Sequence, residues 1–480
     1  MEGPSNQPPA ALGRLSAERD ALASWLCASA LLVGLARFLR LGDWSLWLDE
    51  VYTWGDAHGA AMNNPTGYQV VKAVVDALGE GPTETSLRLA PAVAGFLCIP
   101  LTAWAFHPFA GRRRAGLAAL VVASSAWQVQ WAQTARFYTM AQLLTLVGSG
   151  LALRGVRAGR GVQWVAGLLV SASGAIFHPL ALLLCASLVV AAFVLPPGDE
   201  RGDRRAIRRA SLGLLLAGLA ASPIAFTRFW QGYAASKAVG DAVAGLKHFV
   251  LATGASMTPG VLLMALGGAI VGFAGRDRRA GFLTVVCLLN GALLALASTR
   301  AVVTAQYAFT LFPWVALLGA WPVGLRASRS RPGPAVAWSG LAVLPLLVGL
   351  FLHFTVEHGQ RGRWREAVAL VEELRDPTDL IASTPAVVTE FYLTGSSETE
   401  VRHSDSVLQL DRWGPGRLEP WLRSGREGWV IVRNDYLQQM TVQQRARVRR
   451  LLDEECSLVK RFAAPALGRD LSIDVWRMGG

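Results

Sequence analysis

The feature that most limits the fold of this chain is a series of long apolar stretches separated by short polar loops. A stretch of roughly 17–25 apolar residues can cross the hydrocarbon core of a bilayer as a single helix. We therefore expect a mainly α-helical, polytopic membrane bundle with about eleven membrane-spanning helices. The predicted spans cover residues 21–41, 86–107, 115–132, 138–154, 162–177, 179–196, 210–228, 259–274, 281–298, 306–325 and 335–355.

The composition also indicates a membrane protein. Hydrophobic residues make up 52% of the 480 positions and charged residues only 17%, whereas soluble proteins usually carry about 25% charged residues. A net charge of +12 can indicate nucleic-acid binding, but the excess cations lie in short loops between apolar stretches, so no nucleic-acid partner is predicted. The five cysteines lack the spacing of a metal site and are expected to be packing residues.

Arginine clusters in every second loop predict the topology, because Lys and Arg concentrate on the cytoplasmic side of a membrane. The polar N-terminal segment 1–20 has no cleavable signal pattern and is expected in the cytoplasm. The alternation requires 162–196 to form two helices, divided at His178-Pro179. An odd number of spans then places the C-terminus in the periplasm, outside a bacterial inner (plasma) membrane. The clusters lie at 112–114, 154–160, 201–209, 276–279 and 326–331.

Residues 357–480 are expected to form a small extracytoplasmic α/β domain, because helix and strand patterns alternate there and no stretch is long enough to span. The predicted organisation is therefore a tail of residues 1–20, a transmembrane bundle of 21–356 with an outer loop at 42–85, and this domain. In the outer loop, an amphipathic stripe at 68–78 suits a helix that lies in the membrane interface or packs on the bundle. In the domain, helices are predicted at 363–374 and 441–452, and strands at 379–383, 429–432 and 473–476.

Asp49 and Glu50 follow the first apolar stretch, beside tryptophan and tyrosine residues that are typical of a membrane interface. Carboxylates at the mouth of a membrane helix are costly to desolvate. Adjacent side chains diverge by about 100° on a helix, so one carboxylate can face a cavity as a general base while the other holds the loop or a metal ion. The alternative is a solvated pair with no chemical role.

Further polar side chains lie in loops predicted on the same outer face. Arginine binds phosphate through its bidentate fork and keeps its charge, and histidine and tyrosine can add hydrogen bonds. Together they would suit an anionic phosphate beside an apolar lipid chain. The alternatives are arginines that snorkel to lipid headgroups and a histidine that only ends a helix. The candidates are Arg136, Tyr138, His178, Arg300, Gln306 and Tyr307, whereas Arg88 is expected to anchor a helix end and Arg363 and Trp364 to be structural.

Residues 45–50, Ser-Leu-Trp-Leu-Asp-Glu after a first membrane helix, resemble the first outer loop of the GT-C glycosyltransferases. This superfamily includes the protein O-mannosyltransferases, the lipid A aminoarabinose transferases and related bacterial family-39-like enzymes. The likeness covers most of 21–325. It continues through Asn64-Pro65, residues 87–91 and 135–138, His178-Pro179, Tyr307 and Pro313.

The resemblance implies a glycosyltransferase that moves a sugar from a polyprenyl-phosphate-linked donor to an acceptor hydroxyl at the outer face of the membrane. The acceptor would be a glycan, a lipid or a protein. Asp49, with Glu50 beside it, would be the catalytic base of an inverting single displacement. Thr134 stands where the family often has Glu, and Gln306 where Arg is common. The donor phosphate would be bound by Arg136, Tyr138, His178, Arg300, Gln306 and Tyr307.

Two other functions fit the pattern. A transporter or flippase of lipid-linked sugars also uses intramembrane charges, but it predicts symmetric halves, and no internal repeat is visible in the sequence. A non-catalytic envelope assembly protein of the same fold is the other alternative. No cofactor is predicted as required. A divalent cation, Mg²⁺ or Mn²⁺, stays open because a carboxylate pair can contribute to such a site without completing it.

Overall fold

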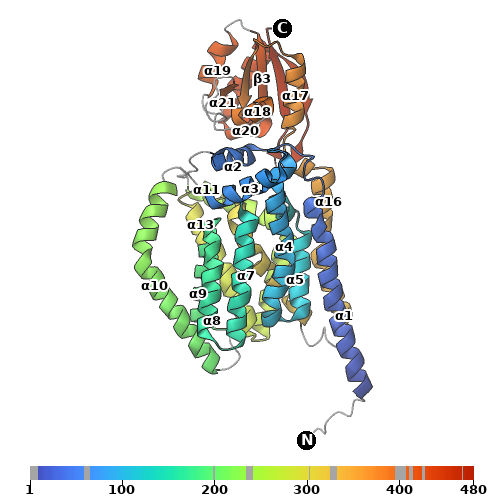
Figure 1. Cartoon of the computed structure of the whole chain (residues 1–480), viewed down its shortest axis with the longest axis vertical. Coiled ribbons are helices and arrows are strands. Elements are labelled where there is room, and N and C mark those ends of the chain that lie inside the picture. The colour runs from blue at the N-terminus through green and yellow to red at the C-terminus, as the bar shows by residue number, and fades with distance from the viewer. Residues whose placement is uncertain are drawn as a thin grey trace. The chain divides into compact units, whose positions relative to one another are not determined.

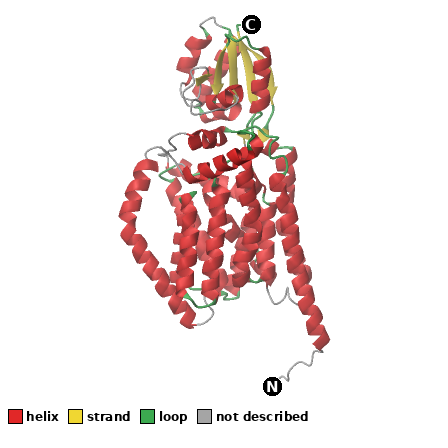
Figure 2. Cartoon of the chain, viewed as in Figure 1, coloured by secondary structure: helices red, strands yellow, loops and turns green. Residues whose placement is uncertain are grey.

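The structure of the chain is a computed structural model that is mainly helical, and the strands that it describes lie in the C-terminal part (Figure 1, Figure 2). Its contacts divide it into two compact units. The bundle unit comprises residues 1–37, 92–132 and 137–349, and the sheet unit comprises 38–91, 133–136 and 350–480. The structure describes residues 9–58, 65–197, 201–233, 242–301, 303–324, 332–394, 407–409, 414–423, 427–466 and 469–479.

Helices occur in each of the predicted apolar stretches, and many run side by side in the bundle unit (Figure 1). The 3-10 segments are η1 (Leu35–Phe38), η2 (Ser173–Ile176), η3 (Ala305–Leu311) and η4 (Trp321–Gly324). The α-helices are α1 (Pro9–Gly34), α4 (Glu84–Ala110), α5 (Arg112–Ser124), α6 (Ala126–Ala132), α7 (Tyr138–Arg157), α8 (Gly161–Ala172), α9 (Leu180–Val194), α10 (Arg201–Tyr233), α11 (Ala242–Met257), α12 (Pro259–Ala274), α13 (Arg278–Ser298), α14 (Phe312–Gly319) and α16 (Pro332–Thr355).

The prediction of an integral membrane protein is confirmed, but the number of spans is confirmed only in part. Among the described residues, four helices are long and apolar enough to cross a bilayer: Ala21–Phe38, Glu84–Ala110, Arg278–Ser298 and Val336–Thr355. The pair α11 and α12, bent by 90°, makes a fifth if it is one span.

Several of the other predicted spans are broken into shorter pieces by local backbone signals. Ser125 is extended, with φ −74° and ψ 117°, and separates α5 from α6. The predicted span 306–325 is divided into η3, α14 and η4. In contrast, the predicted span 259–274 is the single helix α12, which starts at Pro259 after Thr258 with its left-handed φ of 63°. The stretch 162–196 forms two helices as expected, with Pro179 directly before α9.

Small residues allow a close contact between α7 and α8 in the bundle unit. A Cβ atom added at Gly148 would lie 2.1 Å from the Ser171 nitrogen, and one added at Gly167 would lie 2.2 Å from the Ala152 nitrogen. The two backbones therefore touch directly, which is the packing that small residues give to membrane helices.

The C-terminal part of the sheet unit is a mixed five-stranded sheet in the order β2-β1-β3-β7-β4. β1 (Leu380–Thr384) pairs in parallel with β2 (Val407–Gln409) and β3 (Gly428–Arg433), and β7 (Ile473–Met478) is antiparallel to β3 and to β4 (Cys456–Phe462). Strands β5 (Pro465–Ala466) and β6 (Arg469–Asp470) pair with each other as a separate two-stranded antiparallel ribbon. Strand β3 is buried along its whole length, because both faces of the sheet are covered.

Helices cover the sheet on both faces. On one face, Val430 and Val432 of β3 form a core with Leu418 of α19 (Gly414–Leu422) and Val448 of α21 (Val442–Glu455). Helices α17 (Trp364–Leu374) and α18 (Ala386–Thr394) pack on each other and contact β7 and β1. The predicted mixture of helices and strands in the C-terminal part is therefore confirmed, whereas the contacts place this part in one unit with 38–91 and 133–136. Its described elements also include η5 (His358–Gln360) and α20 (Asn434–Gln439).

The predicted outer loop contains two helices of the sheet unit that pack together, α2 (Leu48–His58) and α3 (Pro65–Leu78). The expected stripe on α3 is present, with Val71 and Val75 each 1% exposed, whereas Leu78 at its end is exposed. Asn64 lies outside the described residues. The stripe packs inward and orients α3 against α2, the helix that carries the two candidate carboxylates.

Replacement of Gly167 by Val should destabilise the bundle unit, because the new side chain overlaps the α7 backbone. Overpacking typically costs about 1–3 kcal/mol, and we expect a clear drop in the thermal unfolding temperature of the detergent-purified protein. Gly291→Ala is the matched control, because a Cβ atom at Gly291 on α13 meets nothing within 4 Å. Equal melting temperatures for Gly167→Val and Gly291→Ala would contradict this packing.

Candidate active site around Asp49 and Glu50

Glu50 is placed by the first turn of α2. It is the third residue of the helix, and its Oε2 accepts a hydrogen bond of 3.2 Å from the backbone N–H of Trp47, directly before the helix. A carboxylate at this position satisfies an N–H that a helix start leaves without a partner and interacts favourably with the helix dipole. Asp49 and Glu50 are both acidic residues of this first turn.

Arg88 of α4 forms a bidentate ion pair with Glu50. Its Nε donates to Oε1 at 2.8 Å and its Nη2 donates to Oε2 at 3.0 Å, and both side chains are completely buried. The same guanidinium donates to the carbonyl oxygens of Leu41, Trp44 and Ser45 at 2.8–3.0 Å. Arg88 therefore ties the loop before α2 to α4, and the expectation that it anchors a helix end is confirmed.

A second guanidinium, that of Arg361, reaches Glu50 from the C-terminal part of the sheet unit. Its Nε lies 3.5 Å from Oε2, and its Nη2 donates a short hydrogen bond to the Thr134 hydroxyl. The Ala135 N–H also donates to Oε1, at 2.9 Å. Glu50 therefore gathers three segments that are distant in sequence: the start of α2, the loop 133–136 and residue 361.

The charges of this cluster are compatible with its burial. Burial alone would raise the pKa of the Glu50 carboxyl, but the Arg88 and Arg361 guanidiniums and the hydrogen bonds from Arg88 and Ala135 outweigh it and hold the pKa below the ordinary value of 4.5. Burial lowers the pKa of Arg361 to about 10, although Glu50 acts in the opposite direction. All three groups are therefore ionised at neutral pH.

Asp49 differs from Glu50 in burial and in the hydrogen bonds of its carboxylate. Its side chain is only half-buried, and within the described part of the chain its carboxylate makes no hydrogen bond or ion pair, although it interacts electrostatically with Arg361. Its backbone carbonyl accepts from Thr53 Oγ1 at 2.9 Å, as expected within a helix turn. The two predicted catalytic carboxylates thus diverge, and the geometry gives Glu50 a positioning role and leaves Asp49 accessible.

Arg136 lies directly beside Asp49. Its Nη1 donates to the Asp49 carbonyl oxygen at 3.3 Å, to Thr53 Oγ1 at 3.2 Å and to the Tyr68 hydroxyl at 3.1 Å. The guanidinium also stands 5.6 Å from the centre of the Tyr68 ring. Arg136 is half-buried, so a permanent cation is fixed next to α2 by contacts from both α2 and α3.

Residues of helices α17 and α18 also hydrogen-bond to the loop before α2. The Leu46 N–H donates to the Tyr392 hydroxyl at 2.6 Å, and that hydroxyl donates to Glu84 at 2.9 Å. Burial raises the pKa of the Tyr392 phenol, which keeps the hydroxyl protonated and able to donate. Ser45 Oγ accepts from the Arg365 N–H at 3.0 Å. These hydrogen bonds connect the loop before Asp49 to the C-terminal helices of the sheet unit.

Three other predicted residues meet in the bundle unit. The His178 ring stacks on Phe137 at 5.5 Å and lies 5.1 Å from the Tyr138 ring and 5.6 Å from the Tyr307 ring. His178 Nδ1 accepts the Leu180 N–H at 3.3 Å, so the proton of a neutral imidazole is on Nε2. This aromatic cluster brings together side chains from sequence positions separated by well over a hundred residues.

Arg300 and Gln306 are not brought into that cluster by any contact among the described residues. Arg300 is exposed and Gln306 is half-buried.

Conversely, the sequence analysis missed Arg361 and assigned Arg88 only to a helix end. A buried arginine can be suspected from sequence only when its carboxylate partner is known, and here Glu50 is separated from Arg361 by more than three hundred residues.

Comparisons with known proteins agree with this architecture. No protein-family model matches the chain, and neither does any curated protein sequence. Among solved structures, the apo form of ArnT from Cupriavidus metallidurans aligns with a TM-score of 0.50 and 15% identity, covering 95% of this chain and 98% of that one.

Two structures of an archaeal oligosaccharyltransferase from Archaeoglobus fulgidus are also similar. AglB in complex with an inhibitory peptide and a dolichol-phosphate aligns with a TM-score of 0.53 and 8% identity, over 95% of this chain and 74% of that one. The form tethered to an acceptor peptide with the NVT sequon aligns at 0.52 and 9% identity, over 94% and 75%. The chain therefore shares its fold with ArnT and with this oligosaccharyltransferase, and the predicted resemblance is confirmed at the level of the fold.

Loss of the Arg88 side chain should destabilise the sheet unit strongly. Arg88→Met leaves Glu50 and three carbonyl oxygens without their partner, and breaking a buried ion pair typically costs about 3–5 kcal/mol. Arg365→Met is the matched control, since Arg365 reaches the same loop through Gly42 and Asp43 but is exposed, where an ion pair is worth about 0–1 kcal/mol. Chemical denaturation that shows equal losses would contradict the central role of Arg88.

The same ion pairs predict a pH dependence. Because the folded protein holds the pKa of Glu50 below 4.5, its contribution to stability is complete above about pH 4.5 and is lost as the pH falls through the folded value. The difference in unfolding free energy between the wild-type protein and Glu50→Gln should therefore shrink below pH 4.5. Denaturation at pH 7, 5 and 3.5 measures this, and a constant difference would show that Glu50 titrates normally in the folded state.

Proposed function

We propose that this chain, which has the fold of the GT-C glycosyltransferases, transfers a sugar from a polyprenyl-phosphate-linked donor to an acceptor hydroxyl outside the cytoplasm. One observation carries the proposal. Of two adjacent carboxylates, Glu50 is locked in a buried double ion pair, whereas Asp49 is accessible and stands beside the fixed cation of Arg136. The bound dolichol-phosphate of AglB supports a polyprenyl-phosphate-linked donor here.

Asp49 is proposed as the general base. It would take the proton of the acceptor hydroxyl while that oxygen attacks the anomeric carbon of the donor sugar. The bond from the anomeric carbon to the phosphate oxygen breaks, and the polyprenyl phosphate leaves with the bonding electrons. A single in-line displacement inverts the configuration at that carbon. Arg361 and Arg88 would keep Glu50 charged and the start of α2 in one position, so that Asp49 has a fixed orientation.

Arg136 is proposed to stabilise the leaving phosphate, where negative charge grows during the reaction. Cations held in place before the reaction are effective, because no reorganisation is needed when the charge develops. The hydrogen bonds from Arg136 to Thr53 and Tyr68 hold it in this way. For Tyr138, His178, Arg300, Gln306 and Tyr307, binding of the donor phosphate stays a prediction.

The residues do not suit Glu50 as a metal ligand. Both of its oxygens already accept hydrogen bonds from a guanidinium or a backbone N–H, and the positive charges of Arg88 and Arg361 would oppose the approach of a divalent cation. Asp49 alone offers a single carboxylate, whereas oxygen-ligated Ca²⁺ and Mg²⁺ need several ligands. We therefore propose that the Asp49-Glu50 pair acts without holding Mg²⁺ or Mn²⁺ between its carboxylates.

Asp49→Asn should reduce turnover by about 10²–10⁴-fold, the usual contribution of a general base, with donor affinity and melting temperature nearly unchanged. The assay follows release of labelled sugar from a panel of polyprenyl-phosphate monosaccharides by the purified protein, with membrane extracts as the acceptor source. Asp43→Asn is the control, because Asp43 precedes α2 but is exposed and paired with Arg40. Near-normal transfer by Asp49→Asn would remove Asp49 as the base. Release by neither protein with any donor would argue for a transporter or a non-catalytic assembly protein.

A further inference from the structure

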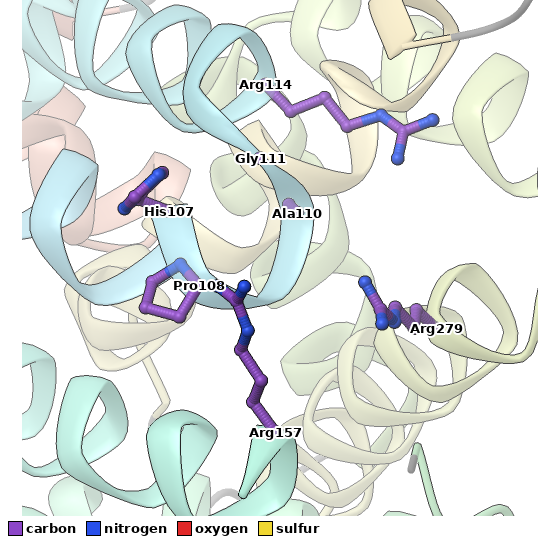
Figure 3. Close-up of a pocket in the computed structure, with 7 residues that line it drawn as sticks. All are labelled: His107, Pro108, Ala110, Gly111, Arg114, Arg157 and Arg279. Carbon is purple, nitrogen blue, oxygen red and sulfur yellow. The ribbon is translucent and has the colours of Figure 1, made fainter. Parts of the chain in front are cut away.

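A cavity of about 460 Å³ opens among the ends of four helices of the bundle unit. Arginines reach it from three different helices: Arg114 from the first turn of α5, Arg157 from the last turn of α7 and Arg279 from the first turn of α13 (Figure 3). The other residues that line it are His107, Pro108, Ala110 and Gly111. No carboxylate is among the lining residues in the described part of the chain, so these residues give the cavity an excess of positive charge.

Two of the three arginines are held in place by contacts with neighbouring elements. Arg114 Nε donates to the Trp321 carbonyl oxygen at 2.9 Å, and its guanidinium lies 4.0 Å from the centre of the Trp321 ring. Arg279 Nη1 donates to the Phe109 carbonyl oxygen at 2.9 Å. Such contacts reduce the side-chain entropy that binding of an anion would otherwise cost.

The acidic residue close to Arg279 in sequence does not enter the cavity lining. Asp277 caps α13, where its Oδ1 accepts the Arg279 N–H at 2.9 Å, and its Oδ2 accepts the Trp321 indole N–H at 3.1 Å. Arg157 is exposed, and within the described residues its side chain makes no hydrogen bond or ion pair. The starts of α5 and α13 and the ends of α4 and α7 meet at the cavity, so their helix dipoles oppose one another and the positive potential comes from the arginines.

We propose that this cavity binds a phosphate group. Guanidinium forks match phosphate oxygens in geometry and charge, and basic pockets between membrane helices are suited to the headgroups of anionic lipids. The phosphate comes either from an anionic phospholipid of the surrounding membrane or from a soluble phosphate. The proposal is independent of the transfer reaction, because it uses none of the residues around Asp49.

The test measures binding of two probes to the full-length, delipidated protein in detergent. Phosphatidylglycerol in mixed micelles is counted by native mass spectrometry and titrated, and inorganic phosphate is titrated at constant ionic strength. Arg157→Gln should weaken binding about tenfold. The matched control is Arg160→Gln, which removes an exposed arginine from the same loop but outside the cavity lining, and it should change binding less than twofold.

The two probes distinguish the sources of the phosphate. If the protein retains phosphatidylglycerol and inorganic phosphate does not displace it, the cavity is a lipid headgroup site. If only inorganic phosphate binds, and its binding depends on Arg157, the ligand is a soluble phosphate. Binding of neither probe would overturn the proposal. Equal losses in Arg157→Gln and Arg160→Gln would also overturn it, because they would show only general attraction to a basic surface.

Discussion

The buried ion pair between Glu50 and Arg88 is the interaction on which the candidate site depends. Removing two charges from water costs several kcal/mol for each ion, and only good geometry with further hydrogen bonds offsets that cost. Here the pair is bidentate, and Arg88 also satisfies the carbonyl oxygens of Leu41, Trp44 and Ser45. The result is a loop whose backbone is fixed by one side chain, directly before the helix that presents Asp49.

This arrangement gives the adjacent carboxylates of Asp49 and Glu50 different environments. Glu50 turns back toward the helix start and is neutralised by two guanidiniums, so it positions the helix and has no contact with solvent. Asp49 points elsewhere because successive side chains on a helix diverge by about 100°. Asp49 is half-buried, and its backbone carbonyl oxygen accepts a hydrogen bond from Arg136. This arrangement suits the proposed general base, with a cation held nearby to stabilise an anion.

The arginines of the two sites fall into three groups that differ in burial and in partners. Arg88 and Arg361 are buried and bind a carboxylate. Arg136 is half-buried and bonded to hydroxyl and carbonyl oxygens beside the candidate base. Arg114, Arg157 and Arg279 line a cavity without a carboxylate. The last group belongs to the loops whose positive charge predicted the topology, so the proposed phosphate site is formed by residues of those loops.

The sequence by itself determined the membrane class, the helical stretches and the α/β nature of the last hundred residues, because hydrophobic length and periodicity are local properties. It also singled out Asp49, Glu50 and Arg136. It did not predict that 115–132 and 306–325 break into shorter helices, and it did not distinguish Asp49 from Glu50. Only the tertiary structure decided which of the two carboxylates is buried and paired. Arg88 and Arg361 are distant from Glu50 in sequence, and their ion pairs form only when the folded backbone brings them to its carboxylate.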